Sequence, residues 1–239
     1  MEEIFKESDK TAGYRVIWRE LKEQGYEVSE YKVRQIMKQN GFYPETCVKY
    51  KPAHNGKTDG KYYKNRLKQN FKTKKPNRVW TGDITYIKTK IGWVYLAVVI
   101  DLFNREVIGY ATSKRMTVEL VKQALANAIG KRGRSDGLIF HSDRGCQYSS
   151  KAYQKMLKEY GIIGSMSRHG CPYDNSCVES FFATLKKERI YRREYFGLND
   201  FRFDMFRYVE LFYNRKRRHS YLGYVSPIRY RMEYEAKFA

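Results

Sequence analysis

Apolar residues near the start of the chain recur at helical spacing. A stripe from Tyr14 to Leu21, with apolar side chains three or four positions apart, predicts a helix that stops at Gly25. A second stripe from Val33 to Met37 predicts another helix, with Ser29 as its N-cap and Gly41 at its end. Residues 1–45 are therefore predicted to form a small helical region.

Two short helices joined by a tight turn are compatible with two interpretations. In a helix-turn-helix, the second helix presents polar side chains to DNA, and its cationic candidates are Lys32, Arg34 and Lys38. In a plain helical subdomain, the same side chains are ordinary solvated residues. The pattern is common and does not choose between them.

The middle of the chain has strand-like patterns. Segments rich in β-branched and aromatic residues predict three consecutive strands, over Val79 to Lys88, Trp93 to Ile100 and Glu106 to Ala111. The apolar stripe that follows predicts a helix that is capped by Thr117 and stops at Gly130.

Strands and helices then alternate. A strand is predicted from Gly137 to His141, a helix over 149–159, a strand over 162–166 and a longer helix over 173–190. The order βββαβαβα predicts an α/β fold over residues 77–195, with a mixed five-stranded sheet flanked by helices. A further helix over 200–214 is predicted within a basic, helical C-terminal extension of residues 196–239.

Charge indicates the kind of partner. Of the 239 residues, 47 are Lys or Arg and 26 are Asp or Glu, so the formal net charge is +21. Because 42% of the residues are hydrophobic, a folded core is expected rather than a disordered polycation, and the charge favours a polyanionic partner. Residues 79–180 hold 14 basic and 9 acidic residues, whereas 1–78 hold 19 and 10 and 181–239 hold 14 and 7. The positive charge is thus concentrated on the flanks of the predicted sheet.

Residues 46–76 are predicted to form a basic linker. From Lys49 to Arg78 there are eleven basic residues and one acid, Asp59, with tyrosines interleaved among them. Pro and Gly residues interrupt the segment and argue against a continuous element. Cations and aromatic rings suit the phosphates and exposed bases of a nucleic acid, and a solubilising tether is the alternative.

The N-terminus, the apolar runs and the cysteines predict a location. The chain begins with acidic residues where a secretory signal is basic. Its uncharged stretch from Ile91 to Ile100 has ten residues, against the ~20 that a membrane-spanning helix needs. Four cysteines suit a reduced compartment. We therefore expect a cytoplasmic protein without a membrane partner, associated with the nucleoid where DNA is the polyanion.

Three acids lie where two strands and a helix can present them together. Asp83 is inside the first predicted strand, Asp143 follows the fourth, and Glu179 borders the apolar stripe of the last core helix. Two carboxylates at ~4 Å repel by roughly 4 kcal/mol at an effective dielectric constant of about 20, so convergence of all three requires a cation. Hard oxygen ligands favour Mg²⁺ or Mn²⁺, and a pair of such ions suits phosphodiester chemistry. Asp101 is a competing ligand, although a turn-forming role is favoured for it.

Several sequence blocks in a fixed order surround these acids. They are Trp80 to Thr85, His141 to Tyr148, Gly170 to Asn175, Glu179 to Phe182, Leu185 to Lys186, Tyr213 to Asn214, Arg218 to Ser220, Leu222 to Tyr224 and Ser226 to Pro227. Together they resemble the second-reading-frame (OrfB) transposases of the IS-three insertion-sequence family, within the retroviral-integrase-like DDE superfamily. Thirty-five residues separate Asp143 from Glu179, as is typical of that superfamily.

The resemblance implies a ribonuclease H-like fold in which Asp83, Asp143 and Glu179 bind two Mg²⁺ or Mn²⁺ ions and form the catalytic triad. It implies that Lys186 faces transposon-end DNA beside this site. The chemistry implied is nicking by water, which frees a 3′-hydroxyl at the element end, followed by attack of that hydroxyl on another phosphodiester.

The resemblance also implies partners. Members of the family act as oligomers on transposon-end and target DNA, usually as a frameshift fusion with an upstream-frame product. This chain has no heptad run of the kind that forms the upstream zipper, so we interpret it as a second-frame product or a truncated form, with the upstream-frame product as a further partner.

The tail contributes a last group of candidate DNA contacts. Four consecutive cations follow the predicted 200–214 helix and are expected to track phosphates: Arg215, Lys216, Arg217 and Arg218. His219 either orients a phosphate or caps the turn.

Three functions are compatible with the sequence at this point. The first is a metal-dependent DNA strand-transfer enzyme, and the second is a non-catalytic protein that binds DNA ends and regulates the fusion transposase. The third is a ribonuclease H-like nuclease that cuts RNA–DNA hybrids.

Overall fold

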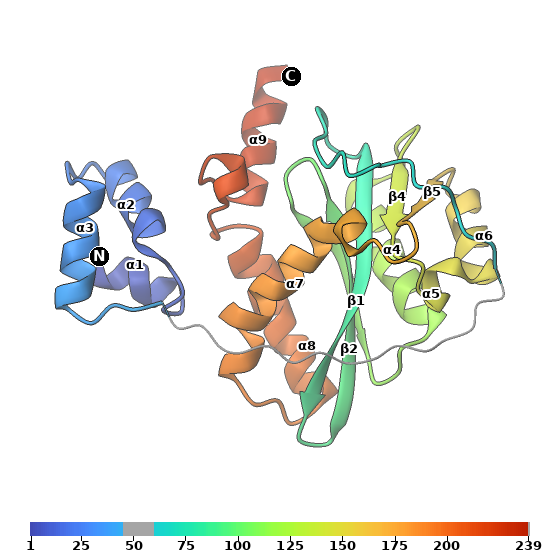
Figure 1. Ribbon diagram of the computed structural model, residues 1–239, viewed down its shortest axis with the longest axis horizontal. Helices are drawn as coiled ribbons and strands as arrows, with labels where there is room; N and C mark the ends of the chain where they lie inside the picture. The colour runs from blue at the N-terminus through green and yellow to red at the C-terminus, as the bar shows by residue number, and fades with distance from the viewer. Residues whose placement is uncertain (45–59, 239) are drawn as a thin grey trace.

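A mixed five-stranded sheet forms the centre of the computed structural model, which describes residues 1–44 and 60–238 (Figure 1). The strands are β1 (Val79–Thr89), β2 (Gly92–Asp101), β3 (Val107–Ser113), β4 (Ile139–Ser142) and β5 (Ile163–Met166), in the spatial order β3-β2-β1-β4-β5. The first three strands pair antiparallel, whereas β4 pairs parallel with β1 and β5 parallel with β4. This order is that of a ribonuclease H-like sheet and confirms the predicted fold class.

The β2 strand is apolar almost throughout because helices cover both of its faces. Ala97 and Val99 belong to the hydrophobic cluster on one face of the sheet, and Val98 and Ile100 to the cluster on the other. Successive side chains of a strand point to opposite faces, so a strand covered on both sides needs consecutive apolar residues.

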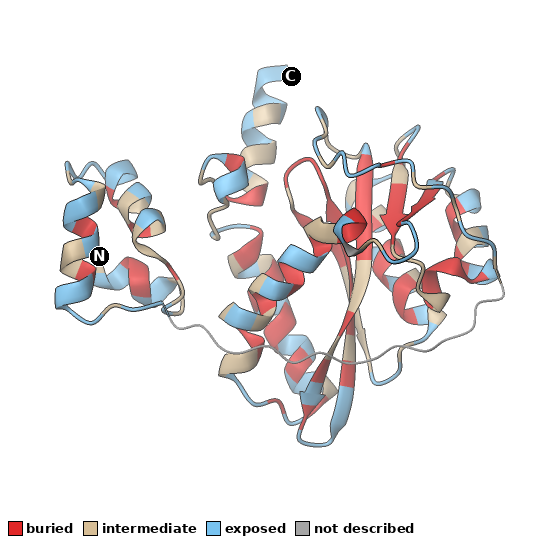
Figure 2. Cartoon of the chain, viewed as in Figure 1, coloured by how far each residue is buried: buried red, intermediate tan, exposed pale blue. Residues whose placement is uncertain are grey.

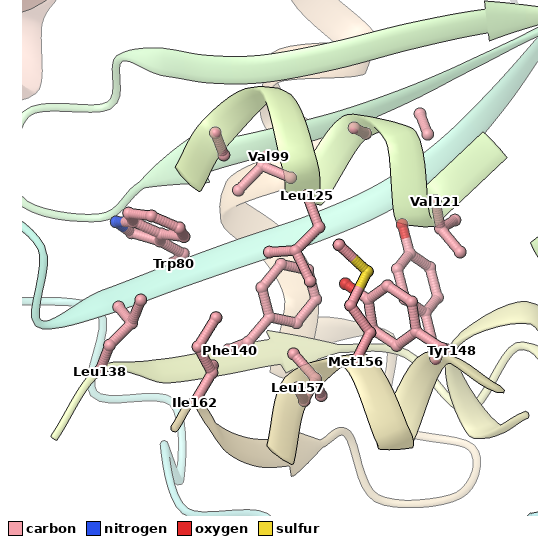
Figure 3. Packing of buried hydrophobic residues seen from close by; sticks show 14 of the residues in the cluster. Trp80, Val99, Val121, Leu125, Leu138, Phe140, Tyr148, Met156, Leu157 and Ile162 are labelled. Atoms are coloured by element: carbon pink, nitrogen blue, oxygen red, sulfur yellow. The ribbon is translucent and has the colours of Figure 1, made fainter. Parts of the chain in front are cut away.

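One face of the sheet is covered by α4 (Val118–Arg132), α5 (Cys146–Ser149) and α6 (Lys151–Glu159). Figure 3 shows this cluster, in which Trp80 and Phe140 of the sheet pack among residues of the three helices. The close approach of α4 to β3 requires a glycine, because a Cβ atom on Gly109 would lie 2.3 Å from the carbonyl oxygen of Ala124.

The predicted end of the first core helix was wrong. α4 continues past Gly130 and ends at Arg132, where Gly133 follows with a φ of 73°. A single glycine is tolerated inside a helix, whereas the left-handed backbone at Gly133 ends it.

The opposite face is covered by α7 (Ser176–Glu188) and α8 (Leu198–Phe206) (Figure 1). The single helix predicted over 200–214 is α8 continued by a π-helix, η3 (Arg207–Tyr213). Short 3₁₀ turns, η1 (Pro172–Asn175) and η2 (Ile190–Arg192), flank α7. α7 therefore lies across the sheet, with its apolar residues facing β1 and β2 and one polar side outside (Figure 2).

The N-terminal residues form three helices around a hydrophobic cluster of their own: α1 (Glu2–Glu7), α2 (Tyr14–Glu23) and α3 (Glu30–Gln39). The predicted N-cap of α3 is confirmed, because the Ser29 hydroxyl accepts a hydrogen bond from the Lys32 amide at 3.2 Å. The α1 helix was not predicted, because its six residues contribute only Ile4 and Phe5 to the core and are too few to show a period.

The described part of the predicted linker packs on the core. Leu67 is buried, and the ring of Tyr63 lies so close to β5 that a Cβ atom on Gly164 would be 2.3 Å from it. Residues 46–59 of that predicted linker lie outside the described residues.

The C-terminal helix α9 (Pro227–Phe238) is anchored to the turn after β2. The ring of Phe103 contacts those of Tyr230 and Tyr234, at centroid distances of 5.3 and 4.8 Å. The side-chain amide of Asn104 donates a hydrogen bond to the carbonyl oxygen of Pro227 at 2.8 Å. In the described part of the chain, no helix has the length and apolar character needed to cross a membrane.

Candidate active site

The β1 strand carries Asp83 with its carboxylate half-buried. The residue before it must be small, because a Cβ atom on Gly82 would lie 2.6 Å from the ring of Phe140. The Asp83 Oδ1 atom accepts a hydrogen bond of 2.7 Å from the amide of Ile84. Packing and this hydrogen bond together fix where the carboxylate lies.

Strand pairing places Asp143 beside Asp83. β4 runs parallel to β1 and pairs Ser142 with Gly82, so the next residue of each strand is an aspartate. The Asp143 Oδ1 atom accepts a hydrogen bond of 2.9 Å from the amide of Gly145. The two aspartates therefore come from adjacent strands, as their positions in the sequence predict.

Glu179 lies in the first turn of α7 and is exposed. The start of this helix is tied to β1 by a hydrogen bond of 2.7 Å from the Thr81 hydroxyl to the Asn175 Oδ1 atom. Both side chains are buried, with 2% and 3% exposure. Thr81 is two residues from Asp83 and Asn175 is four from Glu179, so this contact couples the elements that carry the two acids.

A second group of hydrogen bonds holds the turn before α7. The buried Asp174 carboxylate accepts from the guanidinium of Arg168 at 3.1 Å and from the side-chain amides of Asn65 and Gln69 at 2.8 and 2.9 Å. These hydrogen bonds, chiefly that of Arg168, hold the pKa of Asp174 well below its usual value. Thr81, Asp174 and Asn175 occur in the motif blocks, but sequence reasoning assigned them no role because their partners lie about a hundred residues away.

The three acids are coupled electrostatically. Burial, and then the charge of Asp143, raise the pKa of Asp83 well above its ordinary value, and Glu179 adds to this effect. Burial and Asp143 also raise the pKa of Glu179. Like charges at short range disfavour ionisation, so the protein holds three mutually repelling carboxylates at one end of the β1–β4 pair.

Lys186 partly balances these charges. It lies two turns after Glu179 on α7, half-buried, with its ammonium 5.2 Å from the centroid of the Tyr86 ring. Burial lowers the pKa of Lys186, although Asp83 opposes this, and the positive charge of Lys186 lowers the pKa of Asp83. A single cation does not neutralise three carboxylates.

The donor chemistry fits a hard divalent cation, because all three candidate ligands are carboxylates and the pKa values of Asp83 and Glu179 are raised. Among the residues described, however, no three acidic, histidine or cysteine side chains lie close enough together to hold a metal ion as they stand. Glu179 is the exposed member of the three.

Family models and curated proteins show what the chain is similar to. Residues 73–172 and 160–227 match two family models of the integrase core domain, and residues 1–48 match the model of an HTH-like domain. The chain is 44% identical over 208 residues to the transposase InsF for insertion sequence IS3A of Escherichia coli, covering 87% of this chain and 72% of that protein. The chain belongs to the IS3 family of insertion-sequence transposases.

A second relative of the transposase covers more of the chain. The transposase for insertion sequence element IS904 of Lactococcus lactis is 40% identical over 225 residues, which are 94% of this chain and 88% of that protein. The similarity therefore includes the N-terminal helices as well as the sheet and the C-terminal extension.

Two solved structures are similar over the core. One is the HTLV-2 integrase catalytic core domain in complex with magnesium, at 26% identity over 47% of this chain and 70% of that chain, with a TM-score of 0.40. The other is the simian T-cell lymphotropic virus intasome in complex with PP2A regulatory subunit B56 gamma, at 24% identity over 66% of this chain and 51% of that chain, with a TM-score of 0.45.

Asp101 of the transposase has a structural role. Its Oδ2 atom accepts from the amide of Asn77 at 2.9 Å and its Oδ1 atom from the amide of Phe103 at 3.0 Å. Burial raises the pKa of Asp101 to about 6. The turn-forming role predicted for Asp101 is therefore confirmed.

The predicted DNA-contact residues of the transposase lie in different environments. The candidates on α3 and the first two of the tail are exposed: Lys32, Arg34, Lys38, Arg215 and Lys216. By contrast, Arg217 binds the carboxylate of Glu188 at 2.7 Å. Arg218 binds Glu20 at 2.5 Å and Glu23 at 2.7 Å, which joins the tail to α2. Their DNA contacts stay predictions, and the last two arginines already have acidic partners.

His219 lies where the tail turns back. Its ring packs edge-on against Tyr213 at a centroid distance of 4.9 Å, and its amide donates to the carbonyl oxygen of Val225 at 3.1 Å. Burial, together with the charges of Arg217 and Arg105, lowers the pKa of His219 to about 3. His219 is the N-cap residue of a 3₁₀ turn, η4 (Ser220–Leu222), but its side chain makes no capping hydrogen bond to that turn. Its backbone carbonyl accepts from the amides of Leu222 at 3.0 Å and Tyr224 at 2.8 Å, so only the backbone caps the turn, and a phosphate contact of the ring stays a prediction.

Proposed function

We propose that the chain is a Mg²⁺- or Mn²⁺-dependent DNA transposase that nicks DNA at the ends of its insertion sequence and joins the freed 3′-hydroxyl to a second phosphodiester. The observation that supports this most is the juxtaposition of Asp83 and Asp143 on adjacent parallel strands, with Glu179 coupled to both. A protein that raises the pKa values of its own carboxylates in this way has a site that a cation would stabilise.

The side chains have separate roles in this proposal. Asp83, Asp143 and Glu179 would hold the metal, which when bound would activate a water or hydroxyl nucleophile and stabilise the leaving oxygen. The amides of Ile84 and Gly145 orient the two aspartates through the hydrogen bonds described above. Lys186 is placed to attract the DNA phosphate to the same end of the sheet.

The proposal extends to partners and location. Transposon-end and target DNA supply the polyanion for the +21 net charge, and α3 of the HTH-like region is the proposed reader of the end sequence. We further propose that the chain oligomerises on DNA and cooperates with the upstream-frame product. A DNA substrate places it in the cytoplasm at the nucleoid.

The test is cleavage of DNA that carries the terminal sequences of the element. The wild-type protein should nick it only with Mg²⁺ or Mn²⁺ and should then join the new 3′-end to a second DNA. Glu179→Gln should lower nicking by at least about 10³-fold, the scale of losing one part of a preorganised electrostatic site, while DNA binding persists. Glu194→Gln, an exposed glutamate paired with Lys90, is the matched control and should cut normally.

The other outcomes separate the competing functions. Full nicking by Glu179→Gln would contradict the assignment of the triad. DNA binding by the wild type without any metal-dependent cutting would favour a regulator of the fusion transposase. Cleavage of RNA–DNA hybrids in place of strand joining would favour a nuclease.

A further inference from the structure

A cleft of about 730 Å³ lies beside α7, between the start of α2 and the segment that follows the π-helix. In the described part of the chain, all the charged residues that line it are arginines: Arg15, Arg105, Arg217 and Arg218. The remaining polar lining consists mainly of hydroxyl groups. Such a cleft is cationic and rich in hydrogen-bond donors, and no part of the proposed chemistry uses it.

One wall of the cleft is a row of hydroxyl groups on α7. Ser176, Ser180 and Thr184 line it at intervals of four residues, so they follow one side of the helix. At 1.5 Å per residue the row is ~12 Å long, which corresponds to about three nucleotides of one strand measured along the duplex axis, at ~3.4 Å of axis per phosphate. Ser180, the middle member of this row, directly follows Glu179 in the sequence.

Arg105 adds a cation to the lining of the cleft, next to α7. Its guanidinium lies 4.2 Å from the centroid of the Tyr221 ring. It donates to the Cys177 Sγ atom and to the carbonyl oxygen of Phe71, both at 3.1 Å. These hydrogen-bond partners are neutral, so they orient the guanidinium without cancelling its charge.

The other arginines of the cleft are partly compensated. Arg15 pairs with Glu30, Arg217 with Glu188 and Arg218 with Glu20 and Glu23, but none of these acids lines the cleft. The positive charges of Arg217 and Arg105 contribute to the low pKa of the neighbouring His219. The positive charge of the cleft therefore comes mainly from Arg105, because the other three arginines are paired with acids.

We propose that this cleft binds the phosphodiester backbone of one DNA strand as it leaves the carboxylate centre, with Arg105 and the α7 hydroxyls contacting its phosphates. The inference rests on the proposed function in naming DNA as the ligand. Arginine and hydroxyl side chains are common phosphate ligands in protein–DNA complexes. DNA is favoured over an acidic peptide because the chain carries a net charge of +21, which suits a long polyanion.

The experiment measures the affinity of the full chain for a fluorescent DNA duplex with a single-stranded end, at several salt concentrations. Arg105→Gln should reduce the slope of log affinity against log salt by about 0.9, the share of one phosphate. Its matched control is Arg202→Gln, an exposed arginine that lines a different cavity on the β3 side of the sheet, and it should leave the slope unchanged.

A second pair of variants introduces a negative charge. Ser180→Asp should weaken DNA binding at least about tenfold, because a carboxylate beside a phosphate is repulsive. Asn199→Asp makes the same change of charge at an exposed position of α8 and should have little effect. Thermal unfolding of all four variants checks that a loss of binding is not a loss of fold.

The results separate this inference from the proposed function. If the wild type binds and nicks DNA but Arg105→Gln and Ser180→Asp bind like their controls, the cleft assignment is wrong and the proposed function stands. If poly-glutamate competes for the cleft and Ser180→Asp affects only that competition, the ligand is an acidic peptide and the DNA assignment is wrong. If the wild type does not bind DNA, both are wrong.

Discussion

The carboxylate centre and the arginine pairs of the tail differ in whether their charges are balanced by an opposite charge. At the centre, Asp83 and Glu179 have raised pKa values because burial and neighbouring carboxylates penalise their charged forms. In the tail, Arg217 and Arg218 are matched by acids, and hydrogen bonding to Arg218 is the main reason that the pKa of Glu23 falls to about 2. The first region holds unbalanced charge and the second holds balanced charge.

This difference indicates which charges stabilise the fold and which are expected to bind a partner. Balanced pairs such as Arg217–Glu188 fix the tail in place and add no field that a ligand could use. An excess of one sign is destabilising unless a partner neutralises it, so it is expected where a partner binds. Neutralising one charge should therefore have opposite effects on stability in the two regions.

The largest effect is expected where a balanced pair is broken. Arg217→Met leaves Glu188 buried without its cation, although the Tyr208 hydroxyl still donates to it, and should lower the free energy of unfolding by about 3–5 kcal/mol. The control is Arg215→Met, at an exposed position of the same run, which should change the free energy of unfolding by less than about 0.5 kcal/mol. Equal effects in urea unfolding would show that the Arg217 pair is not a structural contact.

A smaller effect is expected at the contact between β1 and α7. Thr81→Val leaves the Asn175 Oδ1 atom unpaired beside an Nδ2 atom that has no hydrogen-bond partner among the described residues, so stability should fall by about 1–3 kcal/mol. Loosening α7 should also lower nicking by about ten- to a hundredfold without changing DNA affinity. Thr81→Ser keeps the hydroxyl and should restore nicking; failure of this rescue would argue against a positioning role.

The smallest expected effect on stability is a gain rather than a loss. In the presence of a chelator, Asp83→Asn should raise the stability of the fold at pH 8, because it removes a charge that burial and neighbouring carboxylates disfavour. Because the pKa of Asp83 is raised, ionisation of Asp83 destabilises the fold. This destabilisation is absent below the ordinary pKa of 3.8 and is complete above the raised pKa. The gain from the substitution should therefore grow as the pH rises through this window.

Asp174→Asn is the control, because removing its charge is expected to destabilise the fold at pH 8. The pKa of Asp174 is lowered, so its charge stabilises the fold above pH 3.8 and this stability is lost as the pH falls through the lowered value. The variant should thus be less stable than the wild type at pH 8. Urea unfolding at pH 5 and pH 8 compares the two, and a destabilising effect of Asp83→Asn at pH 8 would contradict the account of unbalanced charge.

Much of the fold was predictable from local patterns. Three consecutive β-branched and aromatic segments gave β1 to β3 within about two residues, and the N-cap at Ser29 was found from its residue type. The alternation of strands and helices after Gly137 gave the fold class. Local patterns failed where a short or irregular element depends on tertiary packing, as in α1 and in the π-helix that continues α8.

The site was predictable only in part. Asp83, Asp143 and Glu179 were proposed because strand ends and a helix border present them and because the motif blocks resemble a family. The hydrogen bond between Thr81 and Asn175 and the pairing of Arg218 with Glu20 join residues far apart in the sequence. No spacing rule connects such residues, so their contacts could come only from the structure.

Metal binding by the full chain without DNA tests the central claim most directly. The free Mn²⁺ signal in electron paramagnetic resonance should show saturable binding to the wild type, and Asp143→Asn should weaken this binding at least about tenfold, since even indirect partners of a metal site change affinity by that much. Glu194→Gln, which alters an exposed ion pair, should bind Mn²⁺ like the wild type. Equal affinity in the wild type and Asp143→Asn would show that the three carboxylates do not share a cation.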